Sequence, residues 1–119
     1  MYVEHSFDPR ACTVKDARRL VQSTLDAWAV PEGDSVLLVS ELATNAVLHA
    51  RTPYTVTVST VAPERVRVAV TDDDPSPPIA NLPGSDHATC GRGMYMVLSL
   101  AQRWGCEPVP GGKTVWFET

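Results

Sequence analysis

The segment that decides the fold is the run Val36–Val47, which reads VLLVSELATNAV. Its apolar residues recur at helical spacing, yet it carries an acid, Glu41, and an amide, Asn45, four positions apart. On a helix these two positions lie on nearly the same face, about 6 Å apart along the axis. Burying either side chain without a partner is costly. Each therefore needs a partner, either an ordinary hydrogen-bond network or a metal ion carrying a polyanion.

Helical periodicity extends on both sides of this segment. Apolar positions recur at helical spacing from Val14 to Trp28, and Thr13 is expected to cap the start of that helix. Pro31-Glu32-Gly33 ends it, and either Asp34 or Ser35 can cap the next helix, which is expected to run to about Ala50.

Period-two alternation marks the strands. Residues 54–61 and 65–71 alternate and are rich in β-branched side chains, so they predict a hairpin. Residues 2–7 predict a short edge strand, and residues 106–109 and 114–118 predict a final hairpin. A loop of about fifteen residues, rich in proline, follows the first hairpin. Residues 94–101 then read as a third helix.

These elements predict an α+β fold. We expect a two-layer α/β sandwich with a mixed, largely antiparallel sheet of four or five strands and about three helices on one face. No linker or repeat divides the chain, so residues 1–119 are expected to form a single domain.

Composition narrows the class of protein. The 119 residues are 44% hydrophobic and 20% charged, without a long apolar run or a signal-peptide pattern, so we expect a cytoplasmic protein that does not contact membranes. The formal charge of −4 and the lack of a basic run disfavour nucleic acid as a partner. Three widely spaced cysteines, Cys12, Cys90 and Cys106, predict reduced thiols and disfavour a zinc site.

Three further features suggest a ligand, each with an ordinary structural alternative. Asp72 follows an alternating strand, where its carboxylate would accept a hydrogen bond from a ligand amine or simply form a turn. Gly91-Arg92-Gly93 precedes a helix, either as a phosphate-binding site or as a plain junction. Lys113, in Gly112-Lys113-Thr114, is expected to be a surface lysine in a hairpin turn, and His49 a structural histidine.

The order of these features resembles the GHKL ATPase superfamily. More narrowly, the chain is similar to the small anti-sigma-factor serine/threonine kinases and their actinobacterial relatives. Residues 40–50 resemble the N box of that family, and Gly91–Met94 and Gly112–Phe117 match its later landmarks. The resemblance extends from about Phe7 to Glu118 and implies the histidine-kinase-like ATPase fold.

The resemblance also implies roles for individual residues. Asn45 would coordinate the Mg²⁺ that bridges the phosphates of ATP, and Glu41 would be the general base. Asp72 would accept a hydrogen bond from the adenine amino group, with Thr114 supporting the same contact. Gly91 and Gly93 would let a lid close over the phosphates. The chain departs from the family in one respect, because Asp72–Pro78 holds no glycine.

Three functions follow as alternatives. The leading one is an ATP-dependent kinase in a partner-switching system, which phosphorylates an anti-sigma-factor antagonist and binds a sigma factor. The second is a non-catalytic module, with or without bound ATP, that acts by protein contact alone. A histidine-kinase fragment is disfavoured, because the chain has no dimerisation helix or phosphoacceptor region. Homodimerisation is expected from the resemblance alone.

Overall fold

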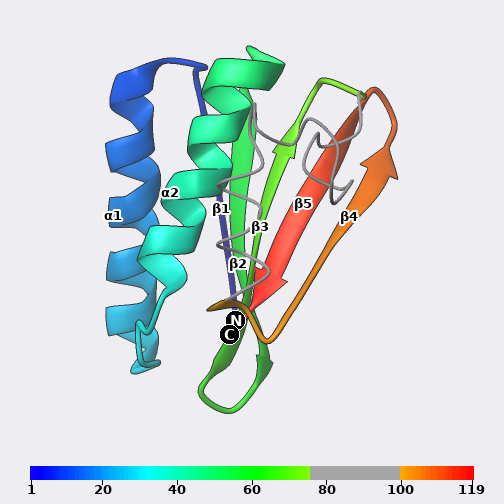
Figure 1. Ribbon diagram of the computed structural model, residues 1–119. Coiled ribbons are helices and arrows are strands. Elements are labelled where there is room, and N and C mark those ends of the chain that lie inside the picture. Colours follow the sequence, from blue (N-terminus) through cyan, green and yellow to red (C-terminus); the bar gives the residue numbers. More distant parts are fainter. Residues whose placement is uncertain (76–99) are drawn as a thin grey trace.

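An antiparallel sheet with helices on one face makes up the part of the chain that the computed structural model describes, residues 1–75 and 100–119 (Figure 1). The elements are β1 (Tyr2–Phe7), α1 (Ala11–Trp28), α2 (Ser35–Asn45), η1 (Ala46–Ala50), β2 (Tyr54–Ala62), β3 (Arg65–Asp72), β4 (Arg103–Val109) and β5 (Gly112–Glu118). The strand order is β1-β2-β3-β5-β4, and every neighbouring pair is antiparallel. The predicted two-layer α+β fold is confirmed, although the described strands form a purely antiparallel sheet.

The two described helices, α1 and α2, contact only part of the sheet. Helix α1 contacts β1 and β2, whereas α2 and the following turn η1 contact β3. Figure 1 shows β5 and β4 extending past the helices on the far side of β3. Two α-helices lie in the described residues, and the third expected helix, 94–101, falls almost wholly outside them. Neither helix is long and apolar enough to cross a membrane.

Alternation divides the sheet into an apolar face and a polar face. The face toward the helices carries the core, because alternate residues of β2, β3 and β5 are buried there. Its members are Tyr54, Val56, Val58, Val66, Val68, Val70, Val115 and Phe117. The opposite face is polar, as the bonds between Thr71 and Thr114 and between Arg67 and Glu118 illustrate.

The start of α1 differs from the sequence prediction. The helix begins at Ala11 with Arg10 at the N-cap position, where no side chain caps the helix. The prediction of Thr13 as the cap is wrong, because Thr13 lies within the first turn. Its hydroxyl instead bonds the Arg10 carbonyl at 2.8 Å and the Tyr54 hydroxyl at 2.8 Å. Thr13 therefore ties the first turn of α1 to the start of β2.

The helix expected to end near Ala50 is confirmed, but its last turn is wider than an α-helix. After Asn45 the chain continues as the π-helical turn η1, in which the Arg51 amide bonds the Ala46 carbonyl at 2.8 Å. Arg51 then adopts a left-handed conformation, with φ of 58°, and ends the helix. Single π-turns are rare in proteins, and those that do occur are often found at functional sites. Asn45 stands directly before this one.

Candidate functional site

Asp72 is the last residue of β3 and lies on the helix-facing side of the sheet. Only 6% of the residue is exposed, and its neighbours in register are Tyr54 on β2 and Lys113 on β5. The Asp74 amide donates to Asp72 Oδ1 at 2.9 Å. Lys113 Nζ lies 3.2 Å from Oδ1 and 3.1 Å from Oδ2. The predicted amine acceptor is thus a buried carboxylate that already holds an ammonium group of the protein.

Lys113 is not the surface residue that the sequence analysis predicted. Its side chain is 13% exposed, and it also donates to the Asp74 carbonyl at 3.1 Å. The prediction is wrong because residues 113, 115 and 117 share one face of β5, the face on which Val115 and Phe117 join the core. That alternation was visible in the sequence and is the signal that would have found Lys113.

Thr114 lies on the opposite face of the sheet from Asp72. Its hydroxyl bonds the Thr71 hydroxyl at 2.7 Å, and the two residues are paired in register. The structure therefore does not place the Thr114 hydroxyl beside the Asp72 carboxylate, where the resemblance implied that it would support an adenine contact. The residue that stands beside the Asp72 carboxylate is Lys113.

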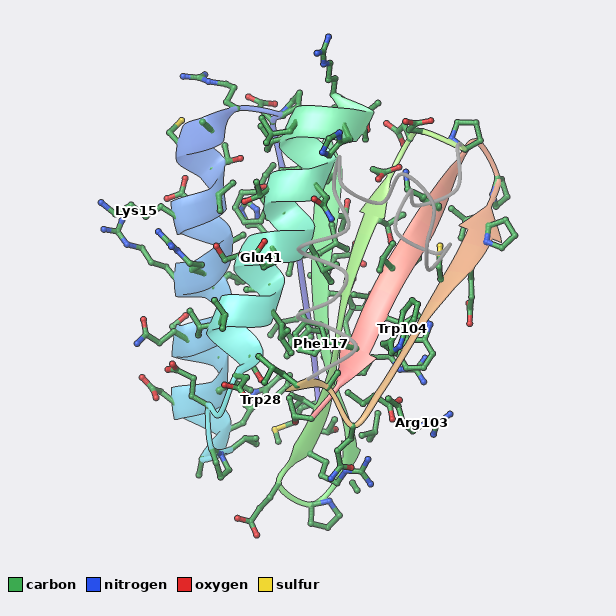
Figure 2. The ribbon with its side chains drawn as sticks, in the orientation of Figure 1. Lys15, Trp28, Glu41, Arg103, Trp104 and Phe117 are labelled. Carbon is green, nitrogen blue, oxygen red and sulfur yellow. The ribbon has the colours of Figure 1, made fainter. Side chains whose placement is uncertain are left out.

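Glu41 and Asn45 flank the buried stripe of α2. At 100° per residue both positions lie next to Leu38 and Leu42 and not opposite them. Both residues are half-buried, and among the described residues neither side chain has a hydrogen-bond or ion-pair partner. Figure 2 shows Glu41 on α2, in the helix layer. The hydrogen-bond network that the sequence left open as an alternative is not formed within the described residues.

The end of α2 and the Asp72 carboxylate are at the same end of the sandwich. Only three residues separate η1 from β2, whose first residue, Tyr54, pairs with Asp72. The Asp73 amide also donates to the Thr52 hydroxyl at 3.0 Å, which joins the segment after η1 to the end of β3. His49 is exposed on η1 at this end. Gly91 and Gly93, expected to complete the site, lie outside the described residues.

The side chains at this end of the sandwich have the chemical groups that a bound nucleotide and a magnesium ion require. Within residues 1–75 and 100–119 no three His, Cys, Asp or Glu side chains gather as a metal cage. Magnesium needs no such cage, because it is commonly held by one or two protein oxygens together with substrate phosphates. The amide oxygen of Asn45 and the carboxylate of Glu41 are suitable ligands for Mg²⁺, and no described residue competes for them. Asp72 supplies an acceptor suited to an amino group.

Cys106 borders the Asp72–Lys113 pair, and the sequence analysis gave it no role. It is paired with Val115 across β4 and β5. The residue is exposed at the sheet edge, yet partial burial of the thiol raises its pKa, and the charges of Asp72 and Glu107 raise it further. The ammonium of Lys113 acts in the opposite direction and lowers the pKa. The pKa of the Cys106 thiol therefore depends on both charges of the Asp72–Lys113 pair.

Comparison with known proteins places this geometry in a family. Residues 7–119 match the model of the histidine kinase-like ATPase domain. No curated protein sequence matches at a significant level. Among solved structures, the chain is similar to the RsbU and RsbW domains of Rv1364c from Mycobacterium tuberculosis, with a TM-score of 0.73 and 17% identity. The match covers 99% of this chain but 32% of that one.

At this identity the structural likeness establishes a shared fold. The family match covers residues 7–119, which include both helices, strands β2 to β5, the last residue of β1 and the described residues of the candidate site. The chain belongs to the histidine kinase-like ATPase domain family.

Proposed function

We propose that this protein binds Mg-ATP and transfers the terminal phosphoryl group to a serine or threonine of a partner protein. The partner would be an anti-sigma-factor antagonist in a partner-switching system, and a sigma factor would be a second binding partner. Membership of an ATPase domain family supports nucleotide binding. The likeness of Ser40–Ala50 to the N box of anti-sigma-factor kinases supports the choice of reaction and partner.

The observation that carries the proposal is the pair of half-buried, unpartnered side chains on α2. Glu41 and Asn45 lack a protein partner among the described residues, and they lie on the helix whose end meets Asp72. Both side chains are half-buried and neither is a buried polar group left unsatisfied, so they remain open to solvent and to a ligand. Because no described residue competes for them, we assign this face of α2 to nucleotide and metal.

Each residue then has a defined task. Asn45 would hold Mg²⁺. The bound ion would neutralise the negative charge of the phosphates. Glu41 would accept the proton of the attacking hydroxyl, and Asp72 would accept a hydrogen bond from the adenine amino group. Phosphoryl transfer depends mainly on positioning and electrostatics, so a small domain with few reactive groups is sufficient for it. Gly91 and Gly93 would complete the phosphate site.

Two observations favour the second candidate, a regulatory module that acts by contact alone. Lys113 already neutralises the Asp72 carboxylate, and the segment Asp72–Pro78 lacks the glycines that the family often has there. Both features affect nucleotide affinity and turnover without affecting the fold. In this second reading the same surface binds the partner, and no phosphate is transferred.

The two candidates are separated by a transfer assay. Wild-type protein and the variants Glu41→Ala and Asp72→Asn are incubated with Mg²⁺, γ-labelled ATP and candidate antagonist domains. The kinase proposal expects label on a partner serine or threonine with the wild type and none with either variant. Calorimetry should show ATP binding retained in Glu41→Ala and lost in Asp72→Asn. Binding of the partner by the wild type without transfer supports the contact-only module and contradicts the kinase.

We further propose that residues 1–119 act as one ATP-binding domain in the cytoplasm and that the domain forms a homodimer. The structural match across 99% of the chain to a part of a larger protein is compatible with such a unit. Light scattering of the purified chain, with and without Mg-ATP, tests the dimer.

A further inference from the structure

We propose that Lys113 reads the nucleobase together with Asp72, as a specificity-determining residue for amino-purines. The inference rests on the proposed nucleotide site. It goes beyond that proposal because the implied recognition assigns the base to Asp72 and Thr114, whereas the structure puts an ammonium group at the same carboxylate. Lys113 would donate a hydrogen bond to the ring nitrogen next to the amino group that donates a hydrogen bond to Asp72.

The carboxylate keeps one site for a ligand donor. An ionised carboxylate offers about four lone-pair sites, two on each oxygen. Oδ1 of Asp72 accepts from the Asp74 amide at 2.9 Å and from Lys113 Nζ at 3.2 Å. Within residues 1–75 and 100–119, Oδ2 accepts only from Lys113, at 3.1 Å. As far as the described residues go, one lone pair of Oδ2 is therefore left to accept an N–H from a bound base.

The ammonium group likewise keeps one donor. Lys113 Nζ is nearly equidistant from the two oxygens of Asp72, at 3.2 and 3.1 Å, as expected when one N–H is shared between them. A second N–H donates to the Asp74 carbonyl at 3.1 Å. An ammonium has three N–H donors, so one remains without an acceptor in the part of the chain that the structure describes. The pair thus presents one acceptor beside one donor.

This arrangement complements an exocyclic amino group next to a ring nitrogen. Adenine has that pattern on two edges, with the amino group beside N1 and beside N7. Hypoxanthine has a carbonyl in place of the amino group and does not match. Guanine would place two donors, N1–H and its amino group, against Asp72, whose Oδ1 is already occupied. The count of donors and acceptors therefore selects adenine.

The pair is also buried and held in place, as a recognition site requires. The side chains of Lys113 and Asp72 are 13% and 7% exposed, and hydrogen bonds to charged groups are strongest where water is excluded. The backbone is tightly packed here, because a β-carbon on Gly112 would meet the Asp72 carbonyl oxygen. A charge fixed in this way discriminates between bases better than a mobile surface lysine.

Base analogues test the inference directly. Binding of ATP, 1-deaza-ATP and 7-deaza-ATP, each with Mg²⁺, is measured by calorimetry on wild type, Lys113→Met and Lys15→Met. The wild type should bind one of the two deaza analogues about 10-fold or more weakly than ATP, the effect of one hydrogen bond from a charged donor. Lys113→Met should bind that analogue and ATP within about twofold of each other. Lys15 is exposed on α1 and points away from the sheet, so Lys15→Met should behave as wild type (Figure 2).

Several outcomes would overturn the inference. Equal binding of all three nucleotides by wild type means that no ring nitrogen is read. Discrimination that persists in Lys113→Met means that another residue reads it. Tighter binding of ATP by Lys113→Met than by wild type means that the lysine competes with the base. If Lys113→Met does not fold, Lys113→Arg, which keeps a donor, should retain the discrimination. Absence of binding by any nucleotide overturns the proposed function together with this inference.

Discussion

Gly112 lies so close to Asp72 that a β-carbon on Gly112 would overlap the Asp72 carbonyl oxygen. The obstacle is backbone, which cannot move without displacing the end of β3. The absence of a side chain at residue 112 is therefore what allows β5 to start beside the Asp72 carboxylate and to place Lys113 against it.

We predict that Gly112→Ala destabilises the protein and distorts the site. Overpacking against a fixed backbone should lower the free energy of unfolding by about 3 kcal/mol or more. Gly111→Ala is the control for conformational strain alone, because Gly111 has nothing within 4 Å of its β-position and its φ of +77° costs about 1–2 kcal/mol. Urea denaturation measures both. A Gly112→Ala variant as stable as wild type would contradict the contact.

Arg67 and Arg103 both approach the buried carboxylate of Glu118 on the polar face of the sheet, but in different ways. Arg67 bonds it through Nε at 2.8 Å and stacks over Trp116 at 3.9 Å, whereas Arg103 is 66% exposed and 3.6 Å away. Glu118 itself is 3% exposed. The contribution of each arginine to stability should follow this difference in geometry.

We predict that Arg67→Met lowers the free energy of unfolding by about 1–3 kcal/mol, since a buried carboxylate loses its main donor. Arg103→Met should change it by less than about 1 kcal/mol, as for an exposed ion pair. Thermal and urea unfolding of the two variants measure the difference. If both substitutions changed the free energy of unfolding equally, the stacking of Arg67 over Trp116 would make no additional contribution to stability.

Glu41 gives a prediction that separates function from stability. Because its side chain has no partner among the described residues, Glu41→Ala should change the free energy of unfolding by no more than about 0.5 kcal/mol. The same variant should lose phosphoryl transfer. A large loss of stability would mean that the carboxylate has a structural partner, and its role as a base would lose its main support.

Much of the fold followed from periodicity in the sequence. The alternation of β2 and β3 and the helical repeat of α1 and α2 predicted these elements within a few residues, since their buried faces are continuous. The start of α1 was missed. Threonine is a residue type that often caps helices, but the Thr13 hydroxyl bonds the Arg10 carbonyl and the Tyr54 hydroxyl instead. The bond to Tyr54 depends on the position of the sheet and not on the local sequence.

The candidate site was only partly predictable. The positions of Glu41, Asn45 and Asp72 followed from a helical repeat and a strand end, and the structure brings the end of α2 and Asp72 to one end of the sandwich. The resemblance implied that Thr114 stands beside Asp72, whereas the structure places Lys113 there and Thr114 against Thr71. Glycine and lysine next to a turn usually indicate that the lysine side chain is exposed at the surface. Here the register of β5 against β3 determines which side chain of β5 faces Asp72.

Cys106 provides a probe of the Asp72–Lys113 pair that needs no nucleotide. Partial burial raises the pKa of its thiol, the negative charge of Asp72 raises it further, and the positive charge of Lys113 lowers it. The thiolate is the reactive form, so the rate of alkylation follows its population. The midpoint of the pH–rate profile of Cys106 should therefore lie above that of an ordinary thiol.

The two charges should shift that midpoint in opposite directions. Asp72→Asn removes a negative charge and should lower the midpoint, whereas Lys113→Met removes a positive charge and should raise it. Iodoacetamide labelling followed by peptide mass spectrometry separates Cys106 from Cys12, an exposed thiol on α1 that serves as the control. Shifts of the same sign in both variants would show that Cys106 responds to a general loosening of the sheet edge. Opposite shifts, with Cys12 unchanged, would establish that the buried ion pair is present in solution.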